Sequence, residues 1–596
     1  MAFFTEYNPL TTEYVDAKVA EKAKADCGKD CTCLAGLSFT FRSESPFAPD
    51  ELKYDILDGK TLKVTENGQT YTAPYAYDRR DNLFLFTHLI PGTSRAWHII
   101  LDNKTWAVTA FETWFGITVP VGYDLAGTRP ARGSRDIPRE IQRQYYFGWA
   151  DKGDNEKPAA LHTTTNRIEG RGLHWEYSTG LERLTFYPSV ICCTVVELGQ
   201  EMGSITQAFG ADYIKIDDEN YIVSNWETEY GGKMRIDVLN FFEMEAFGME
   251  FGFEADDSLT YRMTCAKFEL TGDCAHLESI TSAGDKGQIF RGYGEVKGAR
   301  YAYRPMDIDI PMTREEALAH AAEKQDVLAG SAVNIMQSFN HLPFCYDLVG
   351  RQFTVQPDNP RYAVAPWSGK PGNAIEYDVF SKDMLRWRID GGEWKEDRYA
   401  CFQSDKELYF FSHIMSGDPD VSCMSQVIDF RNGLTTTVKA GIGNWHSEWE
   451  AGADVYFGTL KYKDIKPPFA ARHHFTDELV GKCFAWCYGA NMQSIHLYSS
   501  PESYSWTIFQ GDNSGGACWS SPCFYIKIRP EVYLLQWVEE KCNGSQGLVI
   551  FNRKTQHDSG FFYGVNEDGL RLQVTGAFMR ELGSFDIKKY FGRGIR

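Results

Sequence analysis

The run His162–Ser178, "HTTTNRIEGRGLHWEYS", returns later in the chain as His473–Gly489, "HHFTDELVGKCFAWCYG", and the two align without a gap. Both runs hold a histidine, a threonine, a glycine, a tryptophan and a tyrosine at the same positions. Internal repeats reveal an architecture before single motifs do, because duplicated segments fold alike. The match therefore indicates one structural unit that is present twice.

Further matches extend the repeat in both directions. Upstream, "LKYD" at Leu52–Asp55 resembles "IEYD" at Ile375–Asp378. The run "DNLFLFTH", which ends at His88, resembles "KELYFFSH", which ends at His413. We therefore interpret the chain as four units in the order A, B, A′, B′. Downstream, the aligned pairs are Tyr213 with Tyr525, Trp226 with Trp537, Asn240 with Asn552, Gly248 with Gly560, and Gly252 with Gly564.

The pattern within each unit predicts strands. Short alternating segments are separated by turn signals such as "ENGQ", "KCNGS" and "NEDG", which is typical of hairpin-linked antiparallel strands. Aromatic residues, which favour strands, make up 14% of the chain. Units of this size suit up-and-down barrels, which remove their sheet edges and can enclose one small ligand. The predicted fold class is all-β: four lipocalin-like antiparallel β-barrels in an A–B–A′–B′ duplication, with a few connecting helices.

Two segments are predicted to be helical. Thr313–Gly330 combines capping-box spacing at Thr313 and Glu316 with strong helix formers and a terminal glycine. Residues 11–25, "TTEYVDAKVAEKAKA", are the second candidate. The predicted divisions are 1–34 for an N-terminal segment with a helix, 35–140 for barrel A, 141–310 for barrel B, 311–340 for a linker helix, 341–450 for barrel A′, and 451–596 for barrel B′.

Composition restricts the partners. The formal net charge of −20 repels phosphate backbones, so nucleic acid is not an expected partner. No stretch approaches the roughly 20 apolar residues of a membrane span, and Met1–Leu10 lacks the pattern of a secretory signal. The 15 cysteines suit a reducing, cytoplasmic compartment. Cys27, Cys31 and Cys33 stand apart, because three close thiols can bind a metal or form a disulfide, although no further ligand completes a zinc site.

Two residues of unit B′, Tyr488 and Glu539, are the candidates for catalysis. Trp486 and Tyr488 are two residues apart, and so are Trp537 and Glu539. Residues two apart on a strand share a face, so inward tryptophans bring a phenol and a carboxylate inside the barrel. A carboxylate among aromatic side chains has a raised pKa, which suits proton transfer. The ungapped alignment puts Thr228 at the position of Glu539, so only unit B′ is expected to carry this acid.

A structural interpretation of these residues stays open. Tryptophan and tyrosine on barrel strands pack more often than they react, and a register shift of one residue would turn Glu539 outward. No phosphate-binding glycine loop, nucleophile elbow or metalloprotease motif is found, so no cofactor and no metal are expected. The residues considered for substrate binding are Trp486, His496, Trp506, Trp537, Trp175, Tyr177, Trp226, His88 and His413.

The B units resemble a known family. The runs "HHFTDELVGKCFAWCYG", "YIKI", "YLLQWVEE" and "FFYGVNEDG" resemble the C-terminal domain of MoaF-like proteins, named after molybdenum cofactor biosynthesis protein F. The A units are similar to the N-terminal domain of that family, and the resemblance covers most of the chain. It implies calycin-like barrels, and we do not carry over a role in molybdenum cofactor synthesis.

Barrels of this family are in turn similar to phenolic acid decarboxylases, which protonate a 4-hydroxycinnamate side chain and release carbon dioxide without a cofactor. The resemblance carries their second catalytic tyrosine to Tyr488 and their general-acid glutamate to Glu539. Their first catalytic tyrosine falls on Trp486, and their substrate-binding arginine falls near Thr507. The resemblance therefore implies acid–base chemistry on a conjugated substrate more than it implies this particular decarboxylation.

These observations lead us to expect a cofactor-independent acid–base enzyme. It would be a lyase or decarboxylase, an isomerase or a cyclase that acts on a small aromatic or conjugated molecule inside a barrel. The alternatives are a non-catalytic protein that binds a small hydrophobic ligand, and a structural protein whose barrels are filled with side chains. An open cavity separates the first two from the third. The expected partner is that small molecule, without nucleic acid or membrane, and a homodimer is left open.

Overall fold

The structure is a computed structural model of the chain. The residues it describes are 16–17, 32–115, 141–189, 192–200, 203–227, 233–254, 258–274, 334–335, 340–358, 362–363, 373–443, 451–468, 470–489, 492–510, 518–539, 545–566 and 569–591.

Within these residues the fold is all-β. Strands account for the regular structure, together with the short 3₁₀ helix Lys588–Tyr590. The predicted helix Thr313–Gly330 lies outside the described residues, as does the predicted helix 11–25 except for residues 16–17. The few connecting helices are therefore not seen in the part of the chain that the structure describes. No helix in that part has the length and apolar composition needed to cross a membrane.

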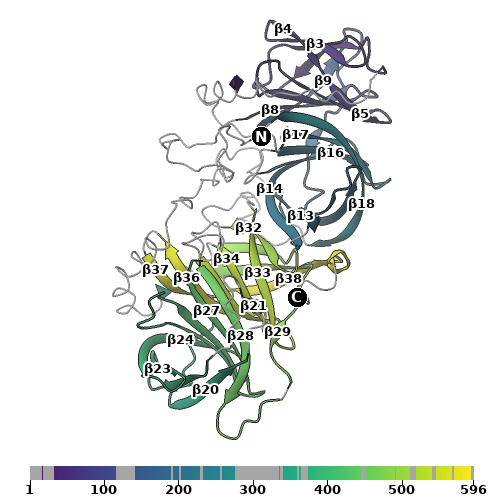
Figure 1. Ribbon diagram of the computed structural model, residues 1–596. Helices are drawn as coiled ribbons and strands as arrows, with labels where there is room; N and C mark the ends of the chain where they lie inside the picture. The colour runs from purple at the N-terminus through teal and green to yellow at the C-terminus, as the bar shows by residue number, and fades with distance from the viewer. Residues whose placement is uncertain are drawn as a thin grey trace. The chain divides into compact units, whose positions relative to one another are not determined.

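The chain forms two compact units (Figure 1). Unit 1 is built mainly from residues Met1–Arg304, and unit 2 mainly from Pro305–Asp512 and Trp519–Arg593. Each unit contains a nine-stranded antiparallel sheet and a set of further strands that close on themselves. The two units are described separately.

Unit 1 begins with a nine-stranded sheet, called sheet A. Its strand order is β4-β3-β2-β1-β9-β8-β7-β6-β5, and its edge strands β4 and β5 are not paired with each other in the described residues. The strands are β1 (Ser38–Ser43), β2 (Leu52–Ile56), β3 (Thr61–Glu66), β4 (Gln69–Pro74), β5 (Ala76–Arg80), β6 (Leu83–Leu89), β7 (Ala96–Asp102), β8 (Ala107–Phe115) and β9 (Ile141–Asp151).

The rest of unit 1 closes into a ring, called ring B, because β11 pairs with β18 as well as with β12. The short strand β10 pairs with β14. The strands are β10 (Thr163–Thr164), β11 (Arg171–Tyr177), β12 (Glu182–Phe186), β13 (Cys192–Gln200), β14 (Gly203–Lys215), β15 (Asn220–Glu227), β16 (Lys233–Asn240), β17 (Glu245–Phe253) and β18 (Leu259–Cys274).

Unit 2 begins with ring A′, in which β20 pairs with both β22 and β28. The strands are β20 (Arg351–Pro357), β21 (Tyr362–Ala363), β22 (Ile375–Val379), β23 (Met384–Ile389), β24 (Lys395–Asp405), β25 (Leu408–Ile414), β26 (Cys423–Asp429), β27 (Leu434–Ile442) and β28 (Ala451–Lys461).

Unit 2 continues with ring B′, which closes through the pairing of β30 with β38. The structure thus has three closed or nearly closed rings, whereas four were expected. The strands are β19 (Asn334–Ile335), β29 (His474–Phe475), β30 (Lys482–Gly489), β31 (Met492–Leu497), β32 (Ser503–Gln510), β33 (Cys518–Arg529), β34 (Val532–Glu539), β35 (Ser545–Asn552), β36 (His557–Asn566), β37 (Gly569–Thr575) and β38 (Phe578–Phe585).

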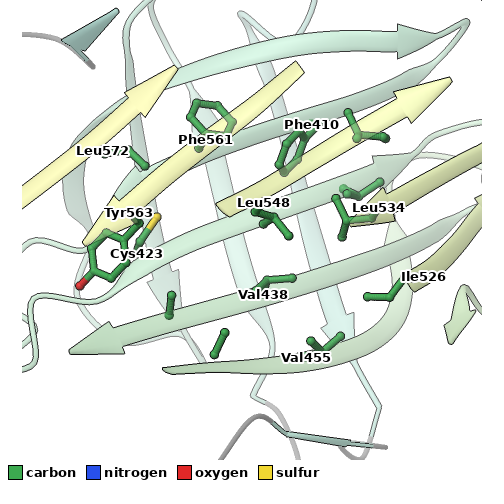
Figure 2. Close-up of a cluster of buried hydrophobic side chains, with 14 of the residues drawn as sticks. Phe410, Cys423, Val438, Val455, Ile526, Leu534, Leu548, Phe561, Tyr563 and Leu572 are labelled. Carbon is green, nitrogen blue, oxygen red and sulfur yellow. The ribbon is translucent and has the colours of Figure 1, made fainter. Parts of the chain in front are cut away.

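Two kinds of apolar core follow from the alternation of side chains along a strand. One face of each strand points into its own sheet or ring, as Trp175 and Tyr213 do in ring B. The other face packs against the neighbouring sheet of the same unit. Figure 2 shows this second kind in unit 2, where Phe410 and Val438 of ring A′ lie among Leu534 and Leu548 of ring B′. Each side chain on such a strand therefore points either into its own sheet or ring, or toward the neighbouring sheet of the same unit.

Candidate functional site

The strand pairings fix how the two B rings correspond. Tyr213 and Tyr525 align in the repeat, and their partners across the ladder are Val223 and Leu535. Two residues further along each partner strand, Trp537 corresponds to Asn225. The expected match between Trp226 and Trp537 is therefore wrong by one residue.

This difference of one residue puts the two tryptophans on opposite faces. Trp226 packs on the apolar cluster between sheet A and ring B, where the guanidinium carbon of Arg143 lies 3.1 Å from its ring centroid. Trp537 lies on the interior face of ring B′, with its ring centroid 5.9 Å from that of Tyr504. Trp226 is thus not part of the interior of ring B, contrary to the expectation from sequence.

Ring B′ brings together most of the residues expected there. The ring of His496 lies 5.5 Å from that of Trp486 and 5.3 Å from that of Tyr504, measured between centroids. Tyr504 in turn contacts Trp537. Tyr488 is half-buried, and its ring centroid lies 6.5 Å from that of His496. The interior of ring B′ is therefore an aromatic cluster around one imidazole.

Burial decides the chemistry of that imidazole. It lowers the pKa of His496 to about 3, so the ring is uncharged at neutral pH. Its Nε2 lies 3.0 Å from the hydroxyl oxygen of Ser494, and its Nδ1 has no hydrogen-bond partner among the described residues. Trp506, which faces His496 across the β31–β32 ladder, is buried as well. A neutral imidazole in this setting can bind a ligand but is a poor acid.

Glu539 is the last residue of β34, and its side chain lies outside the described part of the chain. By the ladder register its counterpart in ring B is Glu227, not Thr228 as expected. A glutamate therefore stands at this position in both rings. The pairing of Tyr488 with Glu539 stays a prediction.

The two histidines of the A units lie in separate cores. His88 is fully buried in sheet A, where its Nε2 lies 3.2 Å from the hydroxyl oxygen of Tyr54 and burial lowers its pKa to about 3. His413 is fully buried in ring A′. Its Nδ1 lies 2.7 Å from a carboxylate oxygen of Asp397, and its Nε2 lies 3.4 Å from the hydroxyl oxygen of Tyr377. Neither histidine joins the aromatic cluster of ring B′.

Ring B holds a buried acid that no motif indicated. Trp175 and Tyr177 stack inside the ring, with centroids 5.6 Å apart and planes at 11°. The Tyr177 hydroxyl donates a hydrogen bond of 3.2 Å to Oδ2 of Asp237 on β16. Gly248 faces Asp237 across the next ladder, and a Cβ there would lie 2.5 Å from Oδ1. The missing side chain of Gly248 makes room for the carboxylate.

The surroundings of Asp237 tune its proton affinity. Burial raises the pKa of Asp237 to about 6, although the nearby Arg235 guanidinium opposes the rise. The guanidinium carbon of Arg235 lies 4.3 Å from the ring centroid of Tyr177. Burial and the neighbouring Asp237 raise the pKa of Tyr177, so its phenol stays protonated. Asp237 can therefore exchange a proton near neutral pH while Tyr177 keeps its own.

Charged side chains form a belt around the inside of ring B, next to this pair. Arg183 faces Trp175 across one ladder and Glu197 across the next, and it binds Glu197. On the other side of the ring, Arg235 binds Glu250, which also accepts a hydrogen bond of 2.6 Å from Arg262. We call Arg183, Glu197, Arg235, Glu250 and Arg262 the charged belt.

The charged belt surrounds a pocket of about 360 Å³. Ligand pockets in proteins commonly span about 300–1,000 Å³, so this volume suits a small molecule. The pocket is lined by Thr179, Leu181, Arg183, Glu197, Phe209, Asn225, Lys233, Met234, Arg235, Glu250 and Arg262. Arg235 belongs to the pocket wall and also covers Tyr177, so it joins the pocket to the Tyr177–Asp237 pair.

The sequence contained a signal for Arg235 and Asp237. In "KMRIDVLN" they alternate with three apolar residues, so the two charged residues share one face of the strand. The apolar residues Met234, Ile236 and Val238 pack toward sheet A, which leaves the charged face inside the ring. Sequence analysis missed this pair because it expected barrel interiors to be aromatic.

A metal site finds no support in the ranges that the structure describes. No group of three or more His, Cys, Asp or Glu side chains there is arranged to hold an ion. Cys33 is exposed, whereas Cys27 and Cys31 lie outside those ranges. The question of a metal or a disulfide at the three thiols therefore stays open.

The family models that match the chain do so in its second half. The family model described as the MoaF N-terminal domain matches residues 334–444, and the one described as the MoaF C-terminal domain matches residues 473–584. No curated protein sequence matches the chain. Among solved structures, a protein from Burkholderia vietnamiensis that is provisionally described as a beta-lactamase matches with 15% identity and a TM-score of 0.16. The match covers 18% of this chain and 96% of that one, and it carries no argument about fold or function.

Proposed function

The chain belongs to the MoaF-like family through its second half, and from this premise we propose that it is a cofactor-independent acid–base enzyme. It acts on a small aromatic or conjugated molecule inside a β-barrel, as a lyase, an isomerase or a cyclase. We assign the reaction to ring B rather than to ring B′. The buried hydrogen bond between Tyr177 and Asp237, beside a pocket, carries this assignment.

Each residue of this group has a chemical task. Asp237 takes up or delivers the proton, because a carboxyl with a pKa of about 6 is ionised but remains protonated in roughly a tenth of molecules at pH 7. Tyr177 fixes the carboxylate through its hydroxyl and keeps its proton. Trp175 stacks on Tyr177 and holds its ring in place.

The test is turnover of a panel of phenolic and conjugated acids, followed by absorbance and by chromatography of the products. Asp237→Asn keeps the shape of the side chain but cannot carry the proton, so it should lower kcat by about 10²- to 10⁴-fold. The kcat/KM of the wild type should bend near pH 6, and that bend should be absent in Asp237→Asn. A substrate that Asp237→Asn turns over at the wild-type rate would contradict the assignment.

The interior of ring B′ supports the alternative function, in which the protein binds a small hydrophobic molecule without catalysis. Its interior is aromatic around His496, whose pKa of about 3 leaves it neutral. The indole nitrogen of Trp486 is buried with no hydrogen-bond partner among the described residues. In this second candidate function, ring B′ holds a small hydrophobic molecule whose polar atom meets that nitrogen. Binding of such a molecule that Trp486→Phe weakens and Asp237→Asn leaves unchanged would favour this alternative.

We also propose that sheet A is the fourth barrel, so that the chain is a duplicated pair of lipocalin-like barrels. A shared anchor supports this proposal. In unit 1, Nδ1 of His162 lies 2.7 Å from the Thr109 hydroxyl oxygen on β8, and in unit 2, Nδ1 of His473 lies 2.8 Å from that of Thr436 on β27. The first histidine of each B unit thus binds the same part of the preceding A unit. An experimental structure in which β4 and β5 stay unpaired would contradict the fourth barrel.

A further inference from the structure

The pocket of ring B carries more positive than negative charge. Four cationic side chains line it, Arg183, Lys233, Arg235 and Arg262, against the two carboxylates of Glu197 and Glu250. This surplus is unexpected in a chain whose formal net charge is −20. A cleft of one sign concentrates small molecules of the opposite sign. The lining therefore selects for an anion.

The ion pairs within the charged belt leave the surplus in place. Arg183 and Glu197 neutralise each other. Glu250 forms ion pairs with three cations. Its carboxylate binds Arg235, and its Oε1 lies 2.6 Å from a guanidinium nitrogen of Arg262 and 3.6 Å from the ammonium nitrogen of Lys233. Burial alone would raise the pKa of Glu250, but Arg235 and Lys233 lower it to about 2. Glu254 also lies 3.3 Å from Arg262 and 3.9 Å from Lys233, so two carboxylates face three cations and one positive charge is left over.

Two strong donors in the pocket wall are also unused. The Nε atoms of Arg183 and Arg235 are buried and have no hydrogen-bond partner in the described part of the chain. Arg235 is only 4% exposed, and Arg183 only 9%. A buried charged donor without an acceptor destabilises the folded protein. An oxyanion in the pocket would meet these two guanidinium groups, which line it and which bind carboxylates and phosphates through charge-assisted hydrogen bonds.

We propose that this pocket binds the oxyanion, a carboxylate or a phosphate, of a small organic molecule between the guanidinium groups of Arg183 and Arg235. Leu181 and Phe209 in the same wall, which pack with the interior cluster of ring B, receive its apolar part. Lys233 and Arg262 lie at the more exposed side of the belt and attract the anion. The inference rests on the proposed function and deepens it, because it names the group by which the substrate of ring B is held.

Ring B′ provides a control within the same chain. Arg235 pairs with Glu250 across the β16–β17 ladder, and the equivalent pair in the β35–β36 ladder is Gly547 with Phe562. The counterpart of Arg183 is Ser494, because Trp175 and Trp486 face these two residues across their ladders. The corresponding positions of ring B′ thus lack both guanidinium groups. Anion binding should therefore occur once per chain.

The experiment is isothermal titration calorimetry of the full-length protein at neutral pH. The probes are cinnamate for the carboxylate arm, phenyl phosphate for the phosphate arm, and cinnamamide as the neutral match of cinnamate. At least one anion should bind with a stoichiometry of one, at least tenfold more tightly than cinnamamide, and more weakly as salt is raised. The arm with the higher affinity identifies the oxyanion. If neither cinnamate nor phenyl phosphate binds more tightly than cinnamamide, the proposal is overturned.

Variants locate the binding. Arg183→Gln and Arg235→Gln should each weaken anion binding by at least tenfold. The control Arg398→Gln, which replaces a partly exposed arginine of ring A′, should leave anion binding unchanged. If the two buried variants do not fold, Lys233→Gln and Arg262→Gln serve instead, with an expected loss of two- to fivefold. Unchanged affinity in every folded variant of the pocket would overturn the site.

One further variant separates this inference from the proposed function. Asp237→Asn removes the proton carrier without removing a cation, so it should bind the anion no more weakly than the wild type. Anion binding without any effect of Asp237→Asn on turnover would reject the acid–base assignment and keep the anion site. Turnover that depends on Asp237 but is equally fast for cinnamate and cinnamamide would reject the anion site and keep the acid–base assignment.

Discussion

Rings B and B′ have equivalent strand pairings, but they differ in the side chains that these strands direct into the ring. In ring B the facing residues are Arg235 and Glu250, and in ring B′ they are Gly547 and Phe562. Trp537 lies flat across Gly547, where a Cβ would come within 2.3 Å of the indole. The same backbone therefore carries a charged belt in one ring and an aromatic packing in the other.

The difference shows which parts of a duplicated barrel are constrained. The outer faces keep their apolar character in both units, because each ring must pack against the preceding sheet or ring. The interior face packs against no other sheet, so its residues can be charged in one ring and aromatic in the other. The matched family domains cover the half with the aromatic interior. A site sought by resemblance alone is thus sought in ring B′, whereas the charges lie in ring B.

The largest expected difference between rings B and B′ is in turnover when their equivalent tyrosines, Tyr177 and Tyr488, are replaced. Tyr177→Phe should lower turnover by about 10²-fold or more, because it removes the hydroxyl that holds the Asp237 carboxylate. Tyr488→Phe should change turnover by less than threefold. Both rates are measured with the same substrate and after circular dichroism has confirmed folding. The opposite order of effects would place the reaction in ring B′.

Among the described residues, rings B and B′ each have one buried acid with a raised pKa, and the larger rise is in ring B′. Burial raises the pKa of Asp558 there to about 8 from 3.8, although the Ala577 amide opposes the rise. A raised carboxyl pKa means that the wild type loses stability as the pH rises from about 4 to about 8.

Asp558→Asn lacks this loss, so its stability relative to the wild type should increase with rising pH, by about 6 kcal/mol in total above pH 8. Asp237→Asn should show a smaller gain, about 3 kcal/mol, complete above pH 6. Urea unfolding at pH 5, 7 and 9 provides the comparison. Parallel pH curves for the wild type and Asp558→Asn would contradict the burial argument.

The two glycines under tryptophans should be equally intolerant of a side chain, although they lie on opposite faces. A Cβ at Gly210 would lie 1.8 Å from the indole of Trp226, and one at Gly547 would lie 2.3 Å from that of Trp537. Gly210→Ala and Gly547→Ala should each destabilise the protein by about 1–3 kcal/mol through overpacking. Gly441→Ala, where the nearest atom is 3.5 Å away, is the control. A neutral effect at Gly547 would argue against Trp537 lying inside ring B′.

The smallest expected effect tests what the two halves share. Thr109→Val and Thr436→Val each remove the hydroxyl that pairs with a buried histidine, His162 or His473. Each should lower the free energy of unfolding by about 1 kcal/mol. Thermal unfolding measures both variants under one condition. Effects that differ by more than twofold would weaken the equivalence of the two anchors.

Much of the fold could be predicted from the sequence, because the repeat and the period-two pattern are local signals. The repeat located the strands of ring B′ by matching them to those of ring B. It failed by one residue at Trp226 and Trp537, because matching these two tryptophans needs a gap that the flanking pairs, Tyr213 with Tyr525 and Asn240 with Asn552, do not have. The strand pairing, in which Tyr213 faces Val223 and Tyr525 faces Leu535, shows the same shift.

The candidate site could be predicted only in part. Trp175 and Tyr177 were recognised from the repeated run, and they do lie inside ring B. Asp237 comes from a strand about sixty residues away and joins Tyr177 only because the ring closes. The pocket forms because Arg183 and Arg235, from two distant strands, both point into ring B. No local sequence pattern indicates that they lie close together.

The most direct test of the account is a crystal structure of the full-length protein with the aryl anion that binds most tightly. The account predicts density inside ring B, with the oxyanion within hydrogen-bond reach of Arg183 and Arg235 and the body of the ligand on Leu181 and Phe209. Density inside ring B′, beside Trp486 and His496 and with ring B empty, would contradict the assignment of the site to ring B.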